Sequence, residues 1–446
     1  MRPNKPERST KATIKKIGIN GEGIAYLDKK ITFVPGALPG EEVLIDVISN
    51  EPKFKIGKVK EIIKPAECRV TPKCKTQKDC LGCPLMIMDY KTQLECKLQL
   101  VKDTFKKYIP EHFADDMLET IIPSGQVSGF RNIVRLPVVD FNGRMCFGIY
   151  QRNTKYLTLM NGCMMQSKRI NSLLSQIEEL FATMHLHAYD EVKRKGVRFL
   201  TVREFDEGMQ LIFVTGLDRL PDRFIDALKA IEDVKSVYVT VNTTRKQDFE
   251  LQKYENKYGK TQMKQIFMQK QFVVSSKADF PVYKAHAVRV AKQIASMGGE
   301  DVEKIIDIGC GIGLYGLSLD DHYEVHGIDT GKININDANA SAHFQNRTNV
   351  HFEDGRIDHL FTPLSKKHHY DLGIVHLDMF TLRDDMIESM LASKTKYFIF
   401  ESEHPSMMAK YMAEFTSLYE IEEIIALDGN PNGPGVHTIA LMTRKR

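Results

Sequence analysis

A glycine-rich stretch in the C-terminal half of the chain contains the residue types of a ligand-binding turn. A predicted apolar strand ends at Asp307, and Gly309, Gly311 and Gly313 form the turn that follows it. Glycines at such positions let the backbone take positive φ angles and approach a ligand closely. A second predicted strand ends at Asp329, about 20 residues beyond the first of these glycines, where a carboxylate can accept hydrogen bonds from ribose hydroxyls. The spacing therefore predicts a site for a ribose-containing ligand.

The order Asp-x-Gly-Cys-Gly-x-Gly, followed by this acid, resembles the S-adenosylmethionine loop of class I methyltransferases. The resemblance implies that Asp307, the three glycines and Asp329 bind this cofactor, and that Asp354, after the third strand, contacts its adenine. The alternative for the same stretch is a tight strand-to-helix turn without a ligand, because function must be argued from the site and not from the fold. Cys310 lies inside the turn, and we expect its thiol to pack there and not to react.

The chain has eight cysteines, and five of them lie between residues 68 and 96. Three follow the pattern Cys74-x5-Cys80-x2-Cys83, and Cys163 lies far downstream. Four thiolates can hold a [4Fe–4S] cluster, and three close ligands with a remote fourth are a recurring arrangement. The alternative is a zinc site of four cysteines, but zinc often uses two Cys-x2-Cys pairs and this set has one. We therefore favour iron–sulfur, and in a reducing cytoplasm we expect no structural disulfide.

The elements that position these residues fall into three predicted domains. Residues 1–64 contain five short segments rich in β-branched residues, which predict a five-stranded β-barrel of the oligonucleotide-binding kind. Residues 65–268 hold the cysteine cluster and then a mixed α+β domain. Residues 269–446 begin with a helix over 282–298 and then alternate strand and helix. That alternation predicts an α/β domain with a doubly wound, mostly parallel sheet, and the glycine turn at its strand ends.

The composition is 42% hydrophobic and 27% charged, which is typical of a soluble globular protein. The sequence has no apolar run long enough for a membrane-spanning helix, and its polar N-terminus is not a secretory signal. These features predict a cytoplasmic protein. Net charge is only +4, but residues 1–64 carry 13 Lys and Arg against 8 Asp and Glu. A β-barrel with such a surplus is either an ordinary solvated surface or an RNA-binding face.

Over nearly its whole length the chain resembles the RNA uracil-5-methyltransferases, especially the iron–sulfur branch that acts on 23S ribosomal RNA. Residues 21–43 look like the TRAM domain, the RNA-binding barrel of that family, and residues 69–85 resemble its cluster loop. Residues 129–138 and 147–166 resemble the central domain around the fourth cluster ligand. The resemblance implies S-adenosylmethionine and a [4Fe–4S] cluster as cofactors, an RNA partner, most specifically ribosomal RNA, and a monomer.

The chain departs from this family at four motifs. The family nucleophile is a cysteine in Ser-Cys-Asn-Pro, and here Glu403 stands at its position; the family's glutamate base is matched by His437. The Asp-Pro-Pro-Arg motif reads His-Leu-Asp-Met from His376, and the Gln-x-Asn motif reads Pro-Val-Tyr over residues 281–283. A carboxylate cannot replace a thiolate in reversible addition to uracil C6, so methylation at C5 by the family route is not expected.

Two functions are consistent with this sequence. The first, which we favour, is an S-adenosylmethionine-dependent RNA methyltransferase with altered chemistry, in which Glu403, His404, His376 or His437 replaces the missing groups. The second is a catalytically inactive RNA-binding or ribosome-assembly protein on the same fold. Binding of the cofactor discriminates between them.

RNA binding is common to both functions. Lys and Arg side chains of the barrel and central domain are expected to contact phosphates. Phe130, Phe147 and Tyr150 are available to stack on extruded bases, but for each of them taken alone core packing is the favoured interpretation.

Overall fold

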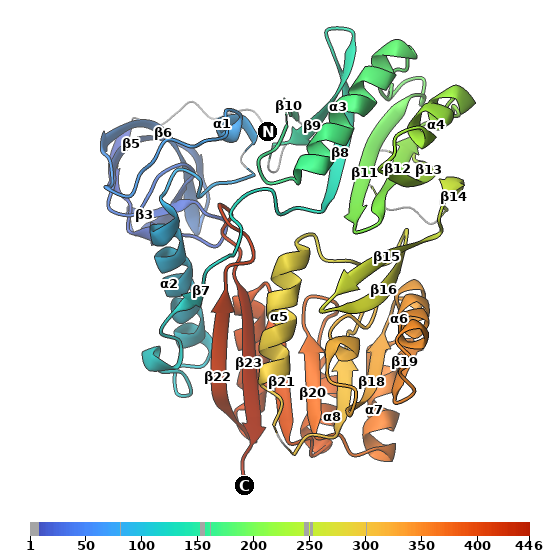
Figure 1. The fold of residues 1–446 in the computed structure, drawn as a ribbon. Coiled ribbons are helices and arrows are strands. Elements are labelled where there is room, and N and C mark those ends of the chain that lie inside the picture. The colour runs from blue at the N-terminus through green and yellow to red at the C-terminus, as the bar shows by residue number, and fades with distance from the viewer. Residues whose placement is uncertain are drawn as a thin grey trace. The chain divides into compact units, whose positions relative to one another are not determined.

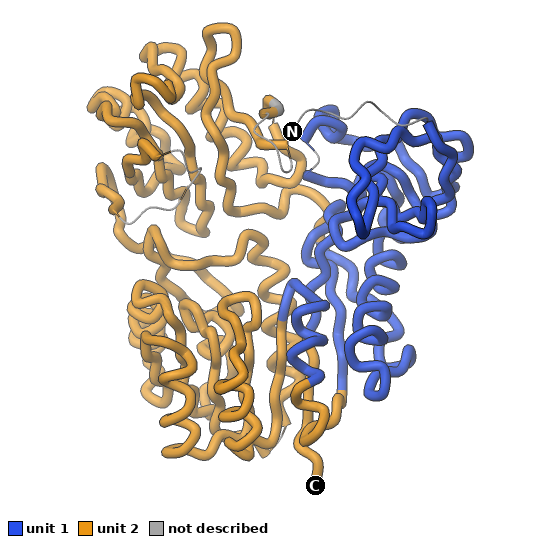
Figure 2. Tube along the Cα trace, turned by 180° about the vertical axis from the view of Figure 1, so that it is seen from behind, with its two compact units in different colours: residues 1–125, 402–413, 423–438 blue, residues 126–401, 414–422, 439–446 orange. Residues whose placement is uncertain are grey.

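The computed structural model describes residues 9–446 except residues 81, 152–156, 161, 245–248, 250–252 and 300. It divides the chain into two compact units, which Figure 2 shows in blue and orange. Unit 1 consists of residues 1–125, 402–413 and 423–438, and unit 2 of residues 126–401, 414–422 and 439–446. Two segments of the C-terminal part of the chain thus belong to the same unit as its first 125 residues.

Unit 1 begins with a sheet of the order β1-β5-β6-β4-β3-β2 (Figure 1). Its strands are β1 (Thr10–Thr13), β2 (Lys16–Ile17), β3 (Gly23–Leu27), β4 (Lys30–Val34), β5 (Glu42–Asn50) and β6 (Phe54–Lys64). The sequence predicted five strands, and within the described residues 9–64 there are six, because the first predicted strand is split. At the split the Ile14 amide donates to Glu41 and the Lys15 amide to Ile24, so the chain changes partner from β5 to β3.

A helix follows the sheet in unit 1. After α1 (Gln77–Cys80), α2 (Tyr90–Tyr108) begins where the Asp89 carboxylate accepts from the amide of Thr92, as an N-cap residue does. Lys97 of this helix is buried, and its ammonium lies 2.6 Å from the carboxylate of Asp428, also buried and in the same unit. Short strand β7 (Ile121–Ile122) comes after the helix and pairs with β22 at Ala426 and Leu427.

The central part of unit 2 is a sheet of the order β10-β9-β8-β11-β12-β13-β14. Its strands are β8 (Ile133–Phe141), β9 (Arg144–Tyr150), β10 (Leu157–Leu159), β11 (Val197–Phe205), β12 (Gly208–Thr215), β13 (Val234–Val241) and β14 (Glu255–Gly259). Helices α3 (Lys168–Thr183) and α4 (Asp222–Lys229) bury their apolar faces in one core with this sheet. The hairpin of β15 (Gln262–Phe267) and β16 (Lys270–Ser275) follows. The mixed α+β character predicted for this region is confirmed.

The C-terminal sheet has the order β19-β18-β17-β20-β21-β23-β22-β7. Its further strands are β17 (Lys304–Ile308), β18 (Glu324–Asp329), β19 (Val350–Asp354), β20 (Leu372–His376), β21 (Tyr397–Ser402), β22 (Tyr419–Leu427) and β23 (His437–Arg444). The helices are α5 (Lys284–Ser296), α6 (Lys332–Phe344), α7 (Ile357–Lys367), α8 (Asp384–Ala392) and α9 (Pro405–Phe415). Five neighbouring strands of this sheet, β19, β18, β17, β20 and β21, are parallel to one another. This confirms the predicted parallel sheet and places the carboxyl ends of these strands at one edge. No helix among the described residues is long and apolar enough to cross a membrane.

Candidate functional site

The glycine turn follows β17, as predicted, and its three glycines take φ angles of 77°, 55° and 71°. A Cβ added to Gly309 would lie 3.0 Å from the Phe380 ring, and one added to Gly313 would lie 2.9 Å from the Phe352 ring. Both glycines are therefore required by close packing as well as by backbone conformation. The turn leads into a single 3-10 turn at Gly316–Ser318, where the sequence predicted a helix. Gly316 approaches Asp307 closely there, because an added Cβ would lie 2.7 Å from the Asp307 carboxylate.

Gly311 differs from the other two glycines because it faces open space. Among the described residues, no heavy atom lies within 4 Å of a Cβ built on Gly311. Its amide donates to Oδ2 of Asp329 at 3.1 Å. Gly311 therefore presents peptide backbone to open space, with the carboxylate of Asp329 beside it. This combination fits the close approach of a ribose-bearing ligand.

Asp329 ends β18 and is 3% exposed. Besides the Gly311 amide, its carboxylate accepts from the amide of Gly331 at 2.6 Å and from Nδ2 of Asn334 at 3.4 Å. An ionised carboxylate offers roughly four lone-pair sites, so these three donors hold the group in place and leave capacity for a further donor. The structure thus joins two predicted site residues, Gly311 and Asp329, by a direct hydrogen bond.

Asp354 and Cys310 lie close to this turn in the fold. Asp354 ends β19 directly beside Asp329 in the parallel register, and its side chain is exposed. Cys310 is buried, and burial raises the pKa of its thiol well above the ordinary value. The thiol therefore stays protonated and packs in the turn, as expected from the sequence.

His376, at the end of β20, lies between two carboxylates. Its Nε2 is 2.7 Å from Oδ1 of Asp307 on β17, and its Nδ1 is 2.7 Å from Oε1 of Glu401 on β21. Burial opposes the charged ring, but Asp307 and Glu401 outweigh burial and raise the pKa of His376 to about 10. The ring of Tyr315 stacks on the imidazole at a centroid distance of 5.0 Å.

This arrangement corrects one prediction. At neutral pH both nitrogens of His376 carry protons and donate to carboxylates, so His376 does not act as a general base. Its partner Asp307 also accepts from the amide of Gly316 at 3.2 Å. The ion pairs therefore connect the glycine turn with the ends of β20 and β21.

Residues 281–283 are those that the sequence matched to the Gln-x-Asn motif of the uracil-5-methyltransferases it resembles. Tyr283 is 5% exposed and stacks on Phe130 with ring centroids 4.6 Å apart. The side-chain amide of Asn132 donates to the Pro281 carbonyl at 2.9 Å and accepts from the Lys284 amide at 3.0 Å. The segment is therefore a packed start to α5.

The aromatic residues proposed to stack on bases are mostly core residues. Phe130 is 7% exposed beneath Tyr283, and Phe147 is 1% exposed in the core of the central sheet. Phe147 packs in the core, which is the interpretation favoured for each of these rings taken alone, because its position on β9 turns its side chain inward. Tyr150 is half-buried.

The remaining residues at family catalytic positions belong to unit 1. The side chains of Glu403 and His404 are exposed just after β21, and His437 at the start of β23 is buried. Ser402 is buried and its hydroxyl accepts from the His404 amide at 2.9 Å.

Each of the predicted cluster ligands is a half-buried cysteine. Cys74, Cys80 and Cys83 belong to unit 1 and Cys163 to unit 2. Cys74 Sγ lies 3.3 Å from the Thr76 hydroxyl. Within the described part of the chain, no group of three or more His, Cys, Asp and Glu side chains is placed to hold a metal ion. The predicted [4Fe–4S] site therefore finds no support in the structure. Residues 81, 152–156 and 161 of the matching stretches lie outside the described residues.

Comparisons with known proteins agree with this fold and site. The family model of the TRAM domain matches residues 8–60, and a family model described as a methyltransferase domain matches residues 300–427. An uncharacterized RNA methyltransferase of Bacillus anthracis is 30% identical to this chain over 97% of the chain and 96% of the relative. The chain belongs to the RNA methyltransferase family. A further RNA methyltransferase, from Halalkalibacterium halodurans, is 28% identical over 96% of this chain and 95% of its own length.

A solved structure shares the fold of this RNA methyltransferase family member. It is the tRNA (uracil-54, C5)-methyltransferase of Pyrococcus abyssi in complex with S-adenosyl-L-homocysteine. The TM-score is 0.76 at 20% identity, covering 97% of this chain and all of the other. The predicted resemblance is confirmed at the level of an RNA methyltransferase with a TRAM domain and a methyltransferase domain.

Sequence reasoning missed three residues that contact the predicted site residues of this RNA methyltransferase. Glu401 and Tyr315 contact His376, and Asn334 donates to Asp329. Glu401 carried a usable signal, because it stands beside His376 in the parallel register of β20 and β21. Tyr315 and Asn334 lie in a turn and at a helix start, where no pattern in one sequence indicates a contact.

Proposed function

We propose that this chain binds S-adenosylmethionine at the glycine turn and transfers its methyl group to a nitrogen or oxygen atom of an RNA nucleotide. The observation that carries the proposal is the open backbone at Gly311 beside the fixed, buried carboxylate of Asp329. The bound cofactor supplies an electrophilic methyl group. Asp329 would accept hydrogen bonds from its ribose, Asp354 would contact its adenine, and the backbone of residues 309–313 would complete the site; after transfer the cofactor would leave as S-adenosylhomocysteine.

The ion pairs of His376 stabilise the strand ends next to the glycine turn. A protonated His376 compensates the buried charges of Asp307 and Glu401 and so allows two carboxylates at neighbouring strand ends. Asp307 in turn holds the end of the glycine turn through the Gly316 amide. These residues position the turn and do not react.

We propose a nitrogen or oxygen target because no cysteine is a candidate for the thiolate that would add to uracil C6. No cysteine follows Cys310 in the sequence, and Cys310 is a buried thiol with a raised pKa. Glu403, at the family's nucleophile position, is exposed and is a poor nucleophile toward a neutral pyrimidine. A nucleophilic nitrogen or oxygen of the substrate itself needs only orientation and loss of a proton.

The substrate class rests on the TRAM match and on the RNA methyltransferase relatives. Ribosomal RNA is the specific prediction from sequence, and transfer RNA is the substrate named for the Pyrococcus abyssi structure. The test is incubation with S-adenosylmethionine carrying a labelled methyl group and with separated ribosomal and transfer RNA, followed by mass spectrometry of the nucleosides. A labelled nucleoside other than 5-methyluridine supports the proposal, and label in 5-methyluridine alone overturns the choice of target atom.

A second function is a catalytically inactive RNA-binding protein. Two observations favour it: His376 is paired with carboxylates and Tyr283 is buried at the former Gln-x-Asn motif. Bound RNA without label in any nucleoside, together with no affinity for S-adenosylmethionine, is the result that this function predicts.

The iron–sulfur cluster, the monomeric state and a cytoplasmic location remain predictions from the sequence. Iron and acid-labile sulfide in anaerobically purified protein test the cluster. Loss of both in a Cys80→Ser, Cys83→Ser variant, with retention in Cys146→Ser, would assign the cluster to the cysteine loop.

A further inference from the structure

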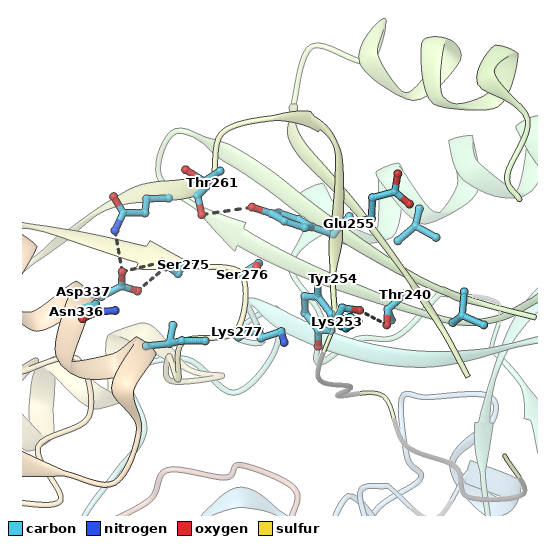
Figure 3. Close-up of a pocket in the computed structure, with 15 residues that line it drawn as sticks. Thr240, Lys253, Tyr254, Glu255, Thr261, Ser275, Ser276, Lys277, Asn336 and Asp337 are labelled. Carbon is cyan, nitrogen blue, oxygen red and sulfur yellow. Dashed lines mark hydrogen bonds between the residues drawn. The ribbon is translucent and has the colours of Figure 1, made fainter. Parts of the chain in front are cut away.

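A groove in unit 2 is lined by residues outside the glycine turn. It has a volume of about 1220 Å³ and opens between β13, the start of β14, the turn after β16, and α6 (Figure 3). The residues that line it include Tyr238, Lys253, Tyr254, Ser276, Lys277 and Asp337. The volume is somewhat above the roughly 300–1,000 Å³ of small-molecule sites, so the groove has room for a nucleotide-sized ligand.

The floor of the groove is held by buried charged groups. The carboxylate of Asp337 accepts from the amide and hydroxyl of Ser275, at 2.6 and 2.7 Å, and from Gln262 at 2.8 Å. The guanidinium of Arg203, which is 4% exposed, donates to the carbonyls of Ser275, Ser276 and Ala278. Because both sides of the turn are tied in this way, the groove keeps its shape before a ligand arrives.

The rim combines the half-buried ring of Tyr254 with cationic side chains, whereas the neighbouring Tyr238 is only 5% exposed. The ammonium of Lys277 lies 4.6 Å from the centroid of the Tyr254 ring, and the Tyr238 ring lies 6.3 Å from that of Tyr254. Lys253 is exposed, and its carbonyl accepts from the Thr240 hydroxyl at 2.6 Å, which fixes the backbone that carries it. Aromatic faces beside Lys side chains are the groups that bind bases and phosphates of single-stranded nucleic acid.

The acidic groups of the groove do not cancel this positive charge. Asp337 is fully buried, and its oxygens are used by three donors. Glu255 pairs with Lys257 of the same strand. Lys253 and Lys277 therefore give the open side of the groove a charge complementary to a phosphate.

One helix connects the groove with the glycine turn. Ile333 and Asp337 of α6 line the groove, and Asn334 of the same helix donates to Asp329 at 3.4 Å. Asn334 also donates to Asp279 at 2.8 Å, just after the turn that forms the groove floor. A chain lying in the groove thus runs beside the helix that helps to hold the proposed ribose-binding carboxylate.

We propose that this groove binds one nucleotide of the RNA substrate next to the methylated one, with its phosphate at Lys253 and Lys277 and its base against Tyr254. The proposal rests on the proposed function, because it names a second subsite for the same RNA.

The first test measures how RNA affinity depends on salt in the full chain. A Lys253→Gln, Lys277→Gln variant is compared with a Lys366→Gln, Lys367→Gln variant, whose lysines are exposed at the end of α7 and outside the groove. The groove variant is expected to lose about one unit of salt slope for each phosphate contact and about tenfold in affinity, and the control to keep both. An unchanged slope in the groove variant overturns the proposal.

The second test separates stacking from charge. Tyr254→Leu is expected to weaken RNA binding roughly tenfold, whereas Tyr254→Phe, which keeps the ring, binds like the parent protein. Equal affinities for the two variants contradict a base at this ring. Both variants are also titrated with S-adenosylmethionine, so that a fold defect is seen as lost cofactor binding.

A nucleoside monophosphate is the alternative ligand with the same chemistry. Tighter binding of uridine monophosphate than of a single-stranded oligonucleotide, lost in the Lys253→Gln, Lys277→Gln variant, would overturn the RNA subsite in favour of a free nucleotide. If the parent protein binds no RNA at all, the proposed function fails; if it binds RNA but the groove variants do so equally, only the groove proposal fails.

Discussion

His376 shows at the scale of one residue how this site differs from a proton-transfer site. A neutral histidine near pH 7 is a natural general base, but this ring is buried between Asp307 and Glu401 and covered by Tyr315. Its charge balances two carboxylates at neighbouring strand ends. From the sequence, His376 was identifiable as a departure from a motif, but its two ion pairs depend on residues 69 and 25 positions away.

Replacing His376 by Ala is expected to destabilise the protein by about 3–5 kcal/mol, because two buried carboxylates lose their shared partner. His359→Ala removes an exposed histidine and is expected to stay within about 0.5 kcal/mol of the parent. Urea denaturation of both variants measures the difference. Equal stabilities would show that the ion pairs contribute nothing.

The pH dependence of stability follows from the same ring. The pKa of His376 is about 10 in the folded chain and about 6.5 in the unfolded chain. The raised pKa means that its stabilisation is complete below about pH 6.5 and is lost as pH rises toward 10. The free energy of unfolding should therefore fall between about pH 7 and pH 10, and fall less in His376→Gln. A parallel decline in the variant contradicts the assignment.

The lowered pKa of His326 predicts that the free energy of unfolding also falls at acidic pH. Burial and the neighbouring His368 and His351 lower the pKa of His326 to about 4 in the folded chain. Its stabilisation is present above about pH 6.5 and is lost as pH falls toward 4, because the unfolded chain takes up the proton first. Unfolding measured between about pH 4 and pH 7 should show a decline that His326→Gln reduces. A decline of the same size in the variant would assign the acid sensitivity to other groups.

At the scale of elements, the glycine turn was the most accurately predicted part of the site. Its glycines have the expected positive φ angles and connect β17 to the start of the next segment. Strand β22 was missed because Glu420, Glu422 and Glu423 interrupt its apolar residues, and the strand buries only one part of its length. The six strands in place of five in residues 9–64 arise from a change of pairing partner, which composition does not report.

Gly311→Ala tests the turn directly. The added methyl group enters the open space beside Asp329, so affinity for S-adenosylmethionine should fall at least about tenfold, while stability falls only by the roughly 1–2 kcal/mol that positive φ costs. Gly40→Ala is the matched control, because Gly40 has a φ of 83° and nothing within 4 Å of an added Cβ among the described residues. Unchanged cofactor affinity in Gly311→Ala would contradict the placement of the cofactor.

Helix α2 is anchored in unit 1 by the buried pair of Lys97 and Asp428. Lys97→Met leaves Asp428 buried without its ammonium and is expected to cost about 3–5 kcal/mol. Lys91→Met on the same helix, where the side chain is 88% exposed, is the control and should be nearly neutral. Guanidinium denaturation compares them, and a neutral Lys97→Met would show that the buried pair contributes nothing to stability.

At the scale of the whole molecule, the chain combines a TRAM domain with a methyltransferase domain, as a member of the RNA methyltransferase family. The alternation of strands and helices was enough to predict the parallel sheet, because burial on both faces leaves a clear pattern. Three features depend on contacts between residues that are far apart in sequence. They are the packing of Phe147, the groove beside α6, and the membership of residues 402–413 and 423–438 in the same unit as residues 1–125. No local pattern predicts such contacts.

The most direct measurement is a calorimetric titration of the anaerobically purified protein with S-adenosylmethionine, alongside Asp329→Ala. We predict that the parent protein binds with a Kd in the micromolar range, which corresponds to a binding free energy of the order of −8 kcal/mol. The variant is predicted to bind at least about tenfold more weakly. No heat of binding by the parent protein at millimolar cofactor would contradict the account and leave an RNA-binding protein with a methyltransferase fold.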